Sequence, residues 1–136
     1  MSRYISESLR EEVEIRAESR CEYCRIRIED TYFGGEIDHI ISLKHRGETA
    51  SENLALACQP CNRNKGSDLG SISQTSNNLV RFFNPRTDDW SEHFRVNESA
   101  EIESLTEIGE VTSFIFGFNE PERIDERKGL IELELY

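Results

Sequence analysis

The sequence lacks any long apolar run. Its longest mostly apolar stretch, residues 111–118, is interrupted by Thr112, Ser113 and Gly117, and it is far shorter than the roughly 20 residues that a helix needs to cross a bilayer. The first residues, MSRYISESLREE, also lack the basic start, apolar stretch and small-residue cleavage site of a signal peptide. We therefore expect a cytoplasmic protein without a membrane partner.

Positive charge is also scarce, with 16 basic against 27 acidic residues and a formal net charge of −11. Residues 1–70 hold 10 basic and 13 acidic residues, whereas residues 71–136 hold 6 and 14, so the acidic excess lies mainly in the second half. A free-standing nucleic-acid binder is usually basic, because phosphate neutralisation supplies most of its affinity. A role on nucleic acid would therefore require a locally positive region.

The cysteines of the sequence are informative about metal binding. The four cysteines form two C-x-x-C pairs, Cys21/Cys24 and Cys58/Cys61. In a reducing cytosol such pairs are more often metal ligands than disulfides. Thiolates at this spacing grip one ion from a tight turn, and a second pair completes a tetrahedron, so the sequence predicts a structural Zn²⁺ site. A redox dithiol or buried free thiols are the alternatives, although a redox dithiol has no need of a second matching pair.

The segment between the two pairs predicts a strand, a loop, a second strand and a short helix. Residues 36–42 and 53–57 are short β runs, antiparallel if the polar loop between them closes a hairpin. Pro60 suits a helical first turn and Gly66 a C-cap, so residues 59–65 should be helical. The inserted hairpin accounts for the 33 residues between the pairs, more than the usual ribbon spacing.

The rest of the sequence predicts an α+β fold with weaker local signals. We expect residues 1–70 to form a zinc-braced core and residues 71–136 an α/β extension packed on it as a single compact domain. The expected flanking elements, in chain order, are a helix over 6–20 capped by Ser6 or Ser8, a strand over 25–33, a loop over 67–78, a strand over 79–83, a short helix capped by Thr87, a hairpin over 94–105, a helix from Thr106, and a last helix from Pro121 with Ile124 and Ile131 inward.

A second group of polar residues remains once the four cysteines are assigned to zinc. Asp38 and His39 lie on the first strand and Asn62 on the short helix. Strand neighbours point to opposite faces, so Asp38 and His39 can face one ion only if the strand is ending or bulged. Carboxylate and amide oxygens suit Mg²⁺, and an imidazole beside that ion can take a proton from water near neutral pH. These elements are the ones that phosphodiester hydrolysis needs.

At this point the sequence resembles the HNH endonucleases of the ββα-metal fold. The resemblance covers about residues 9–66, and the segment 84–94, N-P-R-T-D-D-W-S-E-H-F, looks familiar from stand-alone bacterial members. The family cleaves DNA, and sometimes RNA, usually leaving 5′-phosphate and 3′-hydroxyl ends. The motifs that carry the resemblance are R-C-E-Y-C at 20–24, I-D-H-I-I at 37–41, E-N-L-A-L-A-C at 52–58 and C-N-R-N-K-G at 61–66.

The resemblance implies a role for each residue of the second group. His39 would be the general base, and Asp38 and Asn62 would hold one catalytic Mg²⁺ or Mn²⁺. Asn53 would brace the loop and fix the imidazole. Asn62 stands where many relatives carry His, and Asn still offers an oxygen ligand. Taken singly, each of these residues also has an ordinary structural explanation, as a helix cap or a turn residue; their order between the cysteines favours catalysis.

The expected substrate is nucleic acid, with double-stranded DNA foremost. Residues 38–66 have a net charge of +1, so a locally positive cleft on an acidic body is possible. A non-catalytic zinc module that binds nucleic acid or protein is a second interpretation. A third is a nuclease subunit whose acidic residues 98–134 bind a protein partner or a second copy. The candidate phosphate contacts are Lys44, Arg46, Arg63 and Lys65, the last being alternatively a solvated lysine at the helix end.

Overall fold

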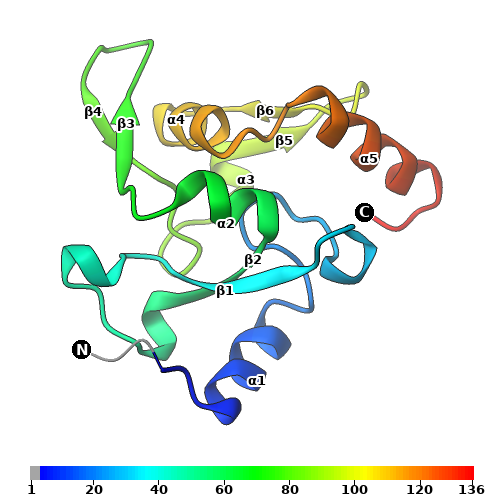
Figure 1. The fold of residues 1–136 in the computed structure, drawn as a ribbon. Helices are drawn as coiled ribbons and strands as arrows, with labels where there is room; N and C mark the ends of the chain where they lie inside the picture. Colours follow the sequence, from blue (N-terminus) through cyan, green and yellow to red (C-terminus); the bar gives the residue numbers. More distant parts are fainter. Residues whose placement is uncertain (1–3) are drawn as a thin grey trace. The chain divides into compact units, whose positions relative to one another are not determined.

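The computed structural model describes residues 4–136. The chain divides into two compact units, the first ending at Leu69 and the second running from Gly70 to Tyr136. Each of the sheets is a two-stranded antiparallel pair, so the fold is α+β, as the sequence predicts. In the part of the chain that is described, no helix has both the length and the apolar character of a membrane span. The elements (Figure 1) are α1 (Glu7–Arg16), η1 (Ile28–Asp30), β1 (Gly35–His39), η2 (Leu43–His45), η3 (Ser51–Asn53), β2 (Leu54–Cys58), α2 (Gln59–Lys65), β3 (Gly70–Ile72), β4 (Leu79–Arg81), α3 (Trp90–His93), β5 (Phe94–Val96), β6 (Ile102–Ser104), α4 (Glu107–Phe116) and α5 (Pro121–Glu132).

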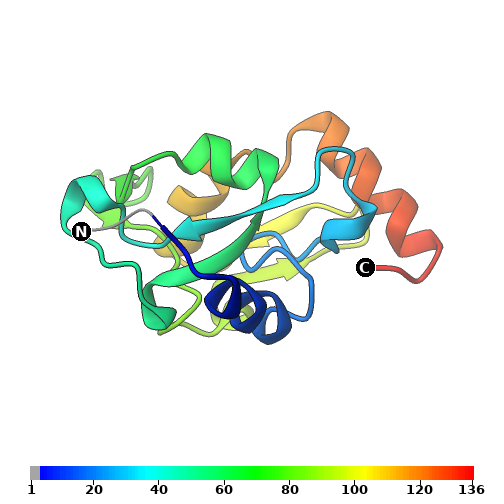
Figure 2. The ribbon, with the colours of Figure 1, turned by 60° about the horizontal axis from the view of Figure 1, so that its bottom comes forward.

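The first unit is built on the β1–β2 hairpin, with α1 and α2 on opposite sides of it (Figures 1 and 2). The register pairs Ile37 with Leu56 and His39 with Leu54. Every residue of β2 is buried, and Leu54 and Leu56 share one hydrophobic core with Val13 of α1. A strand buried on both faces reads as a continuous apolar run, which is the pattern of L-A-L-A-C. The hairpin is thus the centre of the unit.

The predicted order of strand, loop, strand and helix over residues 36–66 is confirmed, although β1 ends at His39 rather than at the predicted residue 42. α2 covers the predicted residues, with Pro60 in its first turn. Gly66 ends the helix with a φ of +53°, a conformation that costs glycine little because it has no Cβ. The backbone N–H of Gly66 donates to the carbonyl of Asn62 at 3.0 Å. Local sequence signals therefore fix both ends of the helix that carries Asn62.

The N-terminal helix is shorter than predicted, because the chain must turn towards the first cysteine pair. Ser6 is its N-cap, with its hydroxyl accepting from the backbone N–H of Leu9 at 3.2 Å. After Arg16 the chain leaves the helix, and Glu18 and Ser19 adopt left-handed φ values of 55° and 57°. The capping interaction was readable from the sequence, whereas the early end of the helix was not.

The predicted strand over residues 25–33 is wrong. This segment contains the single 3₁₀ turn η1 and one isolated bridge between Arg20 and Arg27. The turn after Cys21 folds the chain back on the end of α1, where the backbone N–H of Ile28 donates to the carbonyl of Ser19 at 2.8 Å. Backbone groups that form hydrogen bonds in this way cannot also pair with a neighbouring strand. The alternation of polar residues in this segment therefore does not produce a strand.

The second unit contains two hairpins and three helices, most of them as predicted. The β5–β6 hairpin confirms the expected turn in residues 94–105, and α4 has Thr106 as its N-cap. Strand β3 lies in a stretch predicted to be a loop and pairs with β4. Its Gly-Ser-rich sequence has no strand pattern of its own, so tertiary pairing decides its conformation. Asp89, rather than Thr87, caps the short helix α3.

The last helix buries a different face from the one predicted. Ile131 is exposed, whereas Arg123 and Arg127 are buried. Arg123 donates to the carbonyls of Phe116 and Gly117, and Arg127 donates to the carbonyls of Ala100 and Phe118. A guanidinium has five donors and suits a group of carbonyls left without partners at the end of a helix. Two arginines, rather than isoleucines, therefore hold α5 in place.

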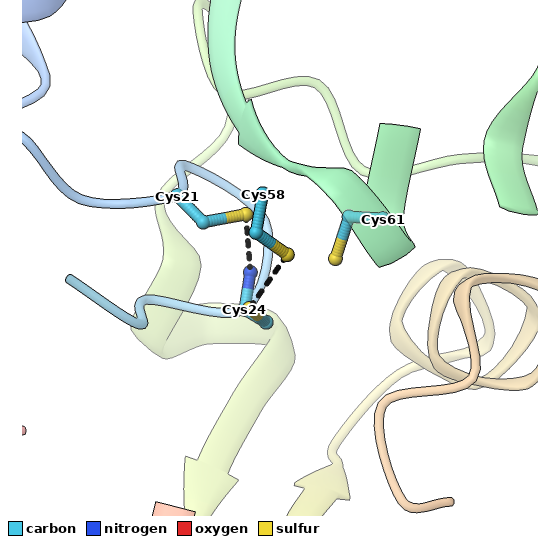
Figure 3. Close-up of side chains that lie close together, drawn as sticks. All are labelled: Cys21, Cys24, Cys58 and Cys61. Atoms are coloured by element: carbon cyan, nitrogen blue, oxygen red, sulfur yellow. Dashed lines mark hydrogen bonds between the residues drawn. The ribbon is translucent and has the colours of Figure 1, made fainter. Parts of the chain in front are cut away.

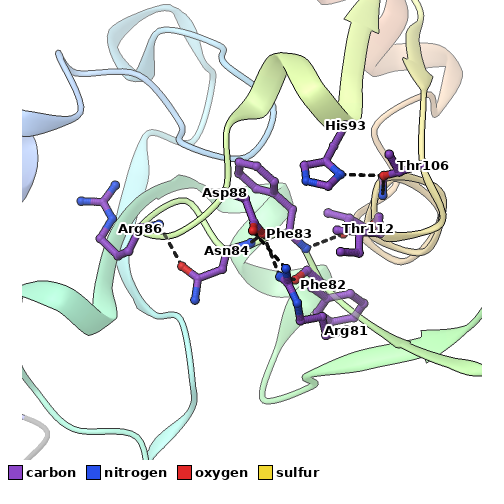
Figure 4. A network of polar contacts seen from close by, with 11 residues as sticks. Arg81, Phe82, Phe83, Asn84, Arg86, Asp88, His93, Thr106 and Thr112 are labelled. Atoms are coloured by element: carbon purple, nitrogen blue, oxygen red, sulfur yellow. Dashed lines mark hydrogen bonds and ion pairs between the residues drawn. The ribbon is translucent and has the colours of Figure 1, made fainter.

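The N-P-R-T-D-D-W-S-E-H-F segment forms a hydrogen-bonded turn (Figure 4). The Asp88 carboxylate accepts from the backbone N–H of Asn84 at 2.8 Å and pairs with Arg81 at 2.7 Å. The Arg81 guanidinium holds the pKa of Asp88 below its usual value. His93 Nδ1 lies 2.6 Å from the hydroxyl of Thr106, the N-cap of α4. These contacts account for the motif as a structural element of the second unit.

Thr112→Val should destabilise the second unit. The buried Thr112 hydroxyl accepts from the backbone N–H of Phe83 at 2.8 Å and donates to the carbonyl of Ile108. Valine has the same shape but leaves that N–H without its partner, at a cost of about 1–3 kcal/mol in unfolding free energy. Urea denaturation followed by the fluorescence of Trp90 measures the loss, with the exposed Thr75→Val as the control. Equal midpoints for the two variants would contradict the assignment.

Candidate active site and zinc centre

The four cysteines converge on one point in the first unit (Figure 3). Their sulfur atoms all lie within 4.8 Å of one another, and all four residues are buried free cysteines. Tetrahedral coordination with Zn–S bonds of about 2.3 Å places the sulfurs roughly 3.8 Å apart, and the Cys24 and Cys58 Sγ atoms lie at 3.6 Å. The cluster therefore fits a structural zinc ion.

The electrostatics of the cluster also favour a bound cation. Hydrogen bonds from neighbouring thiols, above all Cys21, raise the pKa of Cys58, and burial raises the pKa of Cys61. Both shifts arise because thiolates packed together away from water are unfavourable without a compensating positive charge. A zinc ion supplies that charge, and its binding to such thiols is coupled to folding.

The first cysteine pair is tied directly to the second strand. The backbone N–H of Glu22 donates to the carbonyl of Leu56 at 2.8 Å, and the Glu22 carboxylate accepts from the backbone N–H of Leu56 at 2.9 Å. Cys58 then ends β2, and Cys61 lies in the first turn of α2. The knuckle that carries Cys21 and Cys24 is thus placed beside the strand that leads to the other pair.

The three polar residues predicted to form the second site, Asp38, His39 and Asn62, line one pocket of about 330 Å³ in the first unit. Asp38 and His39 are the last two residues of β1, and Asn62 lies on α2. Asp38 and His39 are both paired with β2 in register, and both line this pocket. The pocket is also lined by Ser42, Lys44 and Ser67.

Asp38 is buried with a partner on each carboxylate oxygen. The Tyr23 hydroxyl donates to Oδ2 at 2.7 Å, and Lys65 Nζ donates to Oδ1 at 3.2 Å. Burial raises the pKa of the Asp38 carboxyl, and the charge of Lys65 and the hydrogen bond from Tyr23 oppose that rise. Burial also raises the pKa of Tyr23 well above its ordinary value, so Tyr23 is a neutral O–H donor.

His39 is half-buried, and its Nε2 lies 2.9 Å from the hydroxyl of Thr49. Thr49 belongs to the loop between the strands. A threonine in a polar loop gives no sequence signal of such a contact, so sequence reasoning missed this residue. The hydrogen bond orients the imidazole ring at the edge of the pocket.

Asn53 forms hydrogen bonds with the backbone of the loop between the strands. Its Oδ1 accepts from the backbone N–H of Ile41 at 2.9 Å, and its Nδ2 donates to the carbonyls of Ile41 and Glu48, each at 2.9 Å. These three bonds tie the two ends of the β1–β2 loop together. Asn53 therefore braces the loop that follows His39.

The four expected phosphate contacts have different positions. Lys44, Arg46 and Arg63 are exposed, and Lys44 lines the pocket. Lys65, by contrast, is 2% exposed and forms an ion pair with Asp38. Lys65 is therefore neither a solvated lysine at the helix end nor a lysine that extends from the protein surface. Tyr23, like Thr49, is a site residue to which the sequence analysis gave no role, although its position inside the first C-x-x-C pair was a usable signal.

Removal of the zinc ligands should unfold the first unit. Cys58→Ser leaves three thiolates, and the loss of a structural zinc costs on the order of 10 kcal/mol in apparent binding free energy. Elemental analysis should show less than one zinc per chain, and circular dichroism should show loss of structure. Wild-type protein treated with a zinc chelator should behave in the same way. A variant without zinc that keeps the wild-type melting temperature would contradict a structural role for the metal.

The comparisons with known proteins agree with this geometry. The sequence model of the family described as HNH endonuclease matches residues 21–68, a segment that begins at the first zinc-site cysteine and includes β1, β2 and α2. No curated protein matches the chain significantly. The four-cysteine cluster and the hairpin followed by a helix are the structural features of a ββα-metal domain. Residues 21–68 of this chain are therefore similar to the HNH endonuclease family, and the match does not extend to the rest of the chain.

Proposed function

We propose that the protein is a metal-dependent endonuclease that hydrolyses phosphodiester bonds in DNA. The observation that carries this proposal is the pocket lined together by Asp38, His39 and Asn62 within the HNH domain. A carboxylate, an imidazole and an amide in one open pocket are the side chains that metal-assisted hydrolysis uses. The pocket lies on the zinc-braced unit, so its residues come from rigid elements.

Asp38 and Asn62 are the residues that would hold the divalent ion. Their donor set of carboxylate and amide oxygen matches the preference of Mg²⁺ and Mn²⁺ for oxygen ligands. Each carboxylate oxygen of Asp38 accepts one hydrogen bond, from Tyr23 or from Lys65, and can also bind a second partner. When bound, the ion would stabilise the charge that develops on the phosphate and on the leaving oxygen.

His39 is the proposed general base. A neutral imidazole whose Nε2–H donates to the Thr49 hydroxyl carries its lone pair on Nδ1. In this tautomer Nδ1 takes the proton from the attacking water, and the positive charge that forms on the ring lies near the Asp38 carboxylate of the preceding residue. Asn53 holds the loop that carries Thr49, through its bonds to Ile41 and Glu48.

The phosphate backbone would contact the exposed basic residues of the domain. Lys44 lines the pocket, and Arg46 and Arg63 are exposed in the same unit. Against a net charge of −11, these few cations give weak long-range attraction, so we propose that DNA affinity depends strongly on the catalytic metal. A protein partner or a second copy bound through the acidic second half would be a further source of affinity.

His39→Ala should abolish plasmid nicking while leaving the zinc site and the fold intact. Loss of a general base costs about 10²–10⁴-fold in rate. The measurement is conversion of supercoiled plasmid with Mg²⁺ or Mn²⁺, alongside a single-stranded RNA substrate. His45→Ala is the matched control, since His45 is exposed in the neighbouring turn η2. Equal nicking rates for His39→Ala and wild type would remove His39 as the base, and a wild type inactive on every substrate would favour a non-catalytic binding module.

Thr49→Val should slow the reaction without weakening substrate binding. The substitution removes one hydrogen bond to the imidazole, worth about 1 kcal/mol, which corresponds to a fall in kcat of roughly fivefold. KM for the plasmid should stay at its wild-type value. Thr75→Val, which changes an exposed threonine outside the domain, provides the comparison. An unchanged kcat would show that Thr49 does not orient the base.

A further inference from the structure

The Asp38 carboxylate is held from two sides by residues of two different elements. Tyr23 comes from the first zinc knuckle, and Lys65 is the last residue of α2. Tyr23, Asp38 and Lys65 are 0%, 5% and 2% exposed, so the cluster lies away from water. A carboxylate with a donor on each oxygen has one preferred orientation, because rotation about its side chain would break both bonds.

Stability alone does not account for this buried cluster. Removing an ammonium and a carboxylate from water costs several kcal/mol for each ion, and their attraction often only offsets that cost. An apolar pair of similar volume would serve the core as well or better. The hydroxyl of Tyr23 also lies in the core, 2.7 Å from Asp38 Oδ2. The arrangement therefore points to a function in fixing the orientation of Asp38.

Lys65 joins the two elements that carry the proposed metal ligands. Its Nζ donates to Asp38 Oδ1 at 3.2 Å and also to the backbone carbonyl of His39 at 3.0 Å. Asn62 lies three residues earlier on the same helix, a spacing that puts the two residues on one face. One ammonium thus links the helix of Asn62 to the end of the strand that carries Asp38 and His39.

Tyr23 joins the zinc centre to the same carboxylate. It lies between Cys21 and Cys24, and the knuckle that holds it is closed by the bond from the backbone N–H of Arg25 to the carbonyl of Cys21 at 2.9 Å. The position of the Tyr23 hydroxyl, 2.7 Å from Asp38 Oδ2, is therefore set by the residues that bind zinc. The structural metal and the proposed catalytic metal share one hydrogen-bonded path.

We propose that Tyr23 and Lys65 are positioning residues that hold the Asp38 carboxylate ready for the divalent ion, so that the zinc knuckle sets the affinity of the second metal site. This inference rests on the proposed function of the pocket, because it takes Asp38 as a ligand of the catalytic ion. Partners of a ligand that lie behind it commonly change metal affinity by 10- to 100-fold when they are removed.

The test compares Tyr23→Phe and Lys65→Met with the matched controls Tyr32→Phe and Lys128→Met, whose parent residues are both exposed. Four quantities are measured for each protein: zinc content, melting temperature, Mn²⁺ affinity by titration followed by electron paramagnetic resonance, and the Mg²⁺ dependence of plasmid nicking. Tyr23→Phe and Lys65→Met should each keep one zinc per chain and bind Mn²⁺ about 10- to 100-fold more weakly. The controls should match wild type, and saturating Mg²⁺ should partly restore nicking by Tyr23→Phe.

A merely structural role predicts a different pattern. Variants that melt at lower temperature but keep the wild-type Mn²⁺ affinity would overturn the inference while leaving the proposed function in place, provided that wild type nicks DNA. Tighter Mn²⁺ binding by Lys65→Met would identify Lys65 as a competing cation and overturn its positioning role. Should Lys65→Met fail to fold, Tyr23→Phe decides, because it removes a single oxygen. A wild type that neither binds Mn²⁺ nor nicks DNA would instead overturn the proposed function, and this inference with it.

Discussion

The convergence of four cysteine sulfurs on one point is the constraint on which the rest of the first unit depends. Those sulfurs come from a turn after α1, from the end of β2 and from the first turn of α2, so a single ion closes segments that are far apart in the sequence. A unit of this size has a small apolar core of its own. Closure by a metal compensates for that small core and gives the β1–β2 hairpin a fixed position between the two helices.

The same closure separates two kinds of chemistry. In the function that we propose, sulfur ligands would take the soft ion, and the oxygen and nitrogen donors at the other end of β1 would serve a harder ion and proton transfer. Glu22 and Tyr23 connect the two centres, the first by pairing with Leu56 and the second by its bond to Asp38. The residues between the first two cysteines thus position both the strand and the carboxylate, in addition to spacing the zinc ligands.

The acidic composition has a physical consequence for the proposed nuclease activity. A protein with a net charge of −11 repels DNA at long range, so attraction must come from short-range contacts and from bound cations. Buried arginines add to this effect, because Arg123 and Arg127 bond carbonyls inside the second unit and offer no charge to a substrate. Among the exposed cations of the first unit, Lys44 lines the pocket, and Arg46 and Arg63 lie elsewhere in the same unit.

The sequence by itself determined the features that depend on short spacings. The two C-x-x-C pairs predicted the metal cluster, and Pro60 and Gly66 predicted the helix that carries Asn62, because capping and chelation act within a few residues. Only the tertiary structure decided the strand β3, the buried face of α5 and the burial of Lys65 against Asp38. Each of these depends on a partner distant in sequence: a strand gains its ladder, and a buried charge its counter-charge, only where the folded chain supplies the other member. Residue type and local order could therefore identify Lys65 as a cation, but not its role beside Asp38.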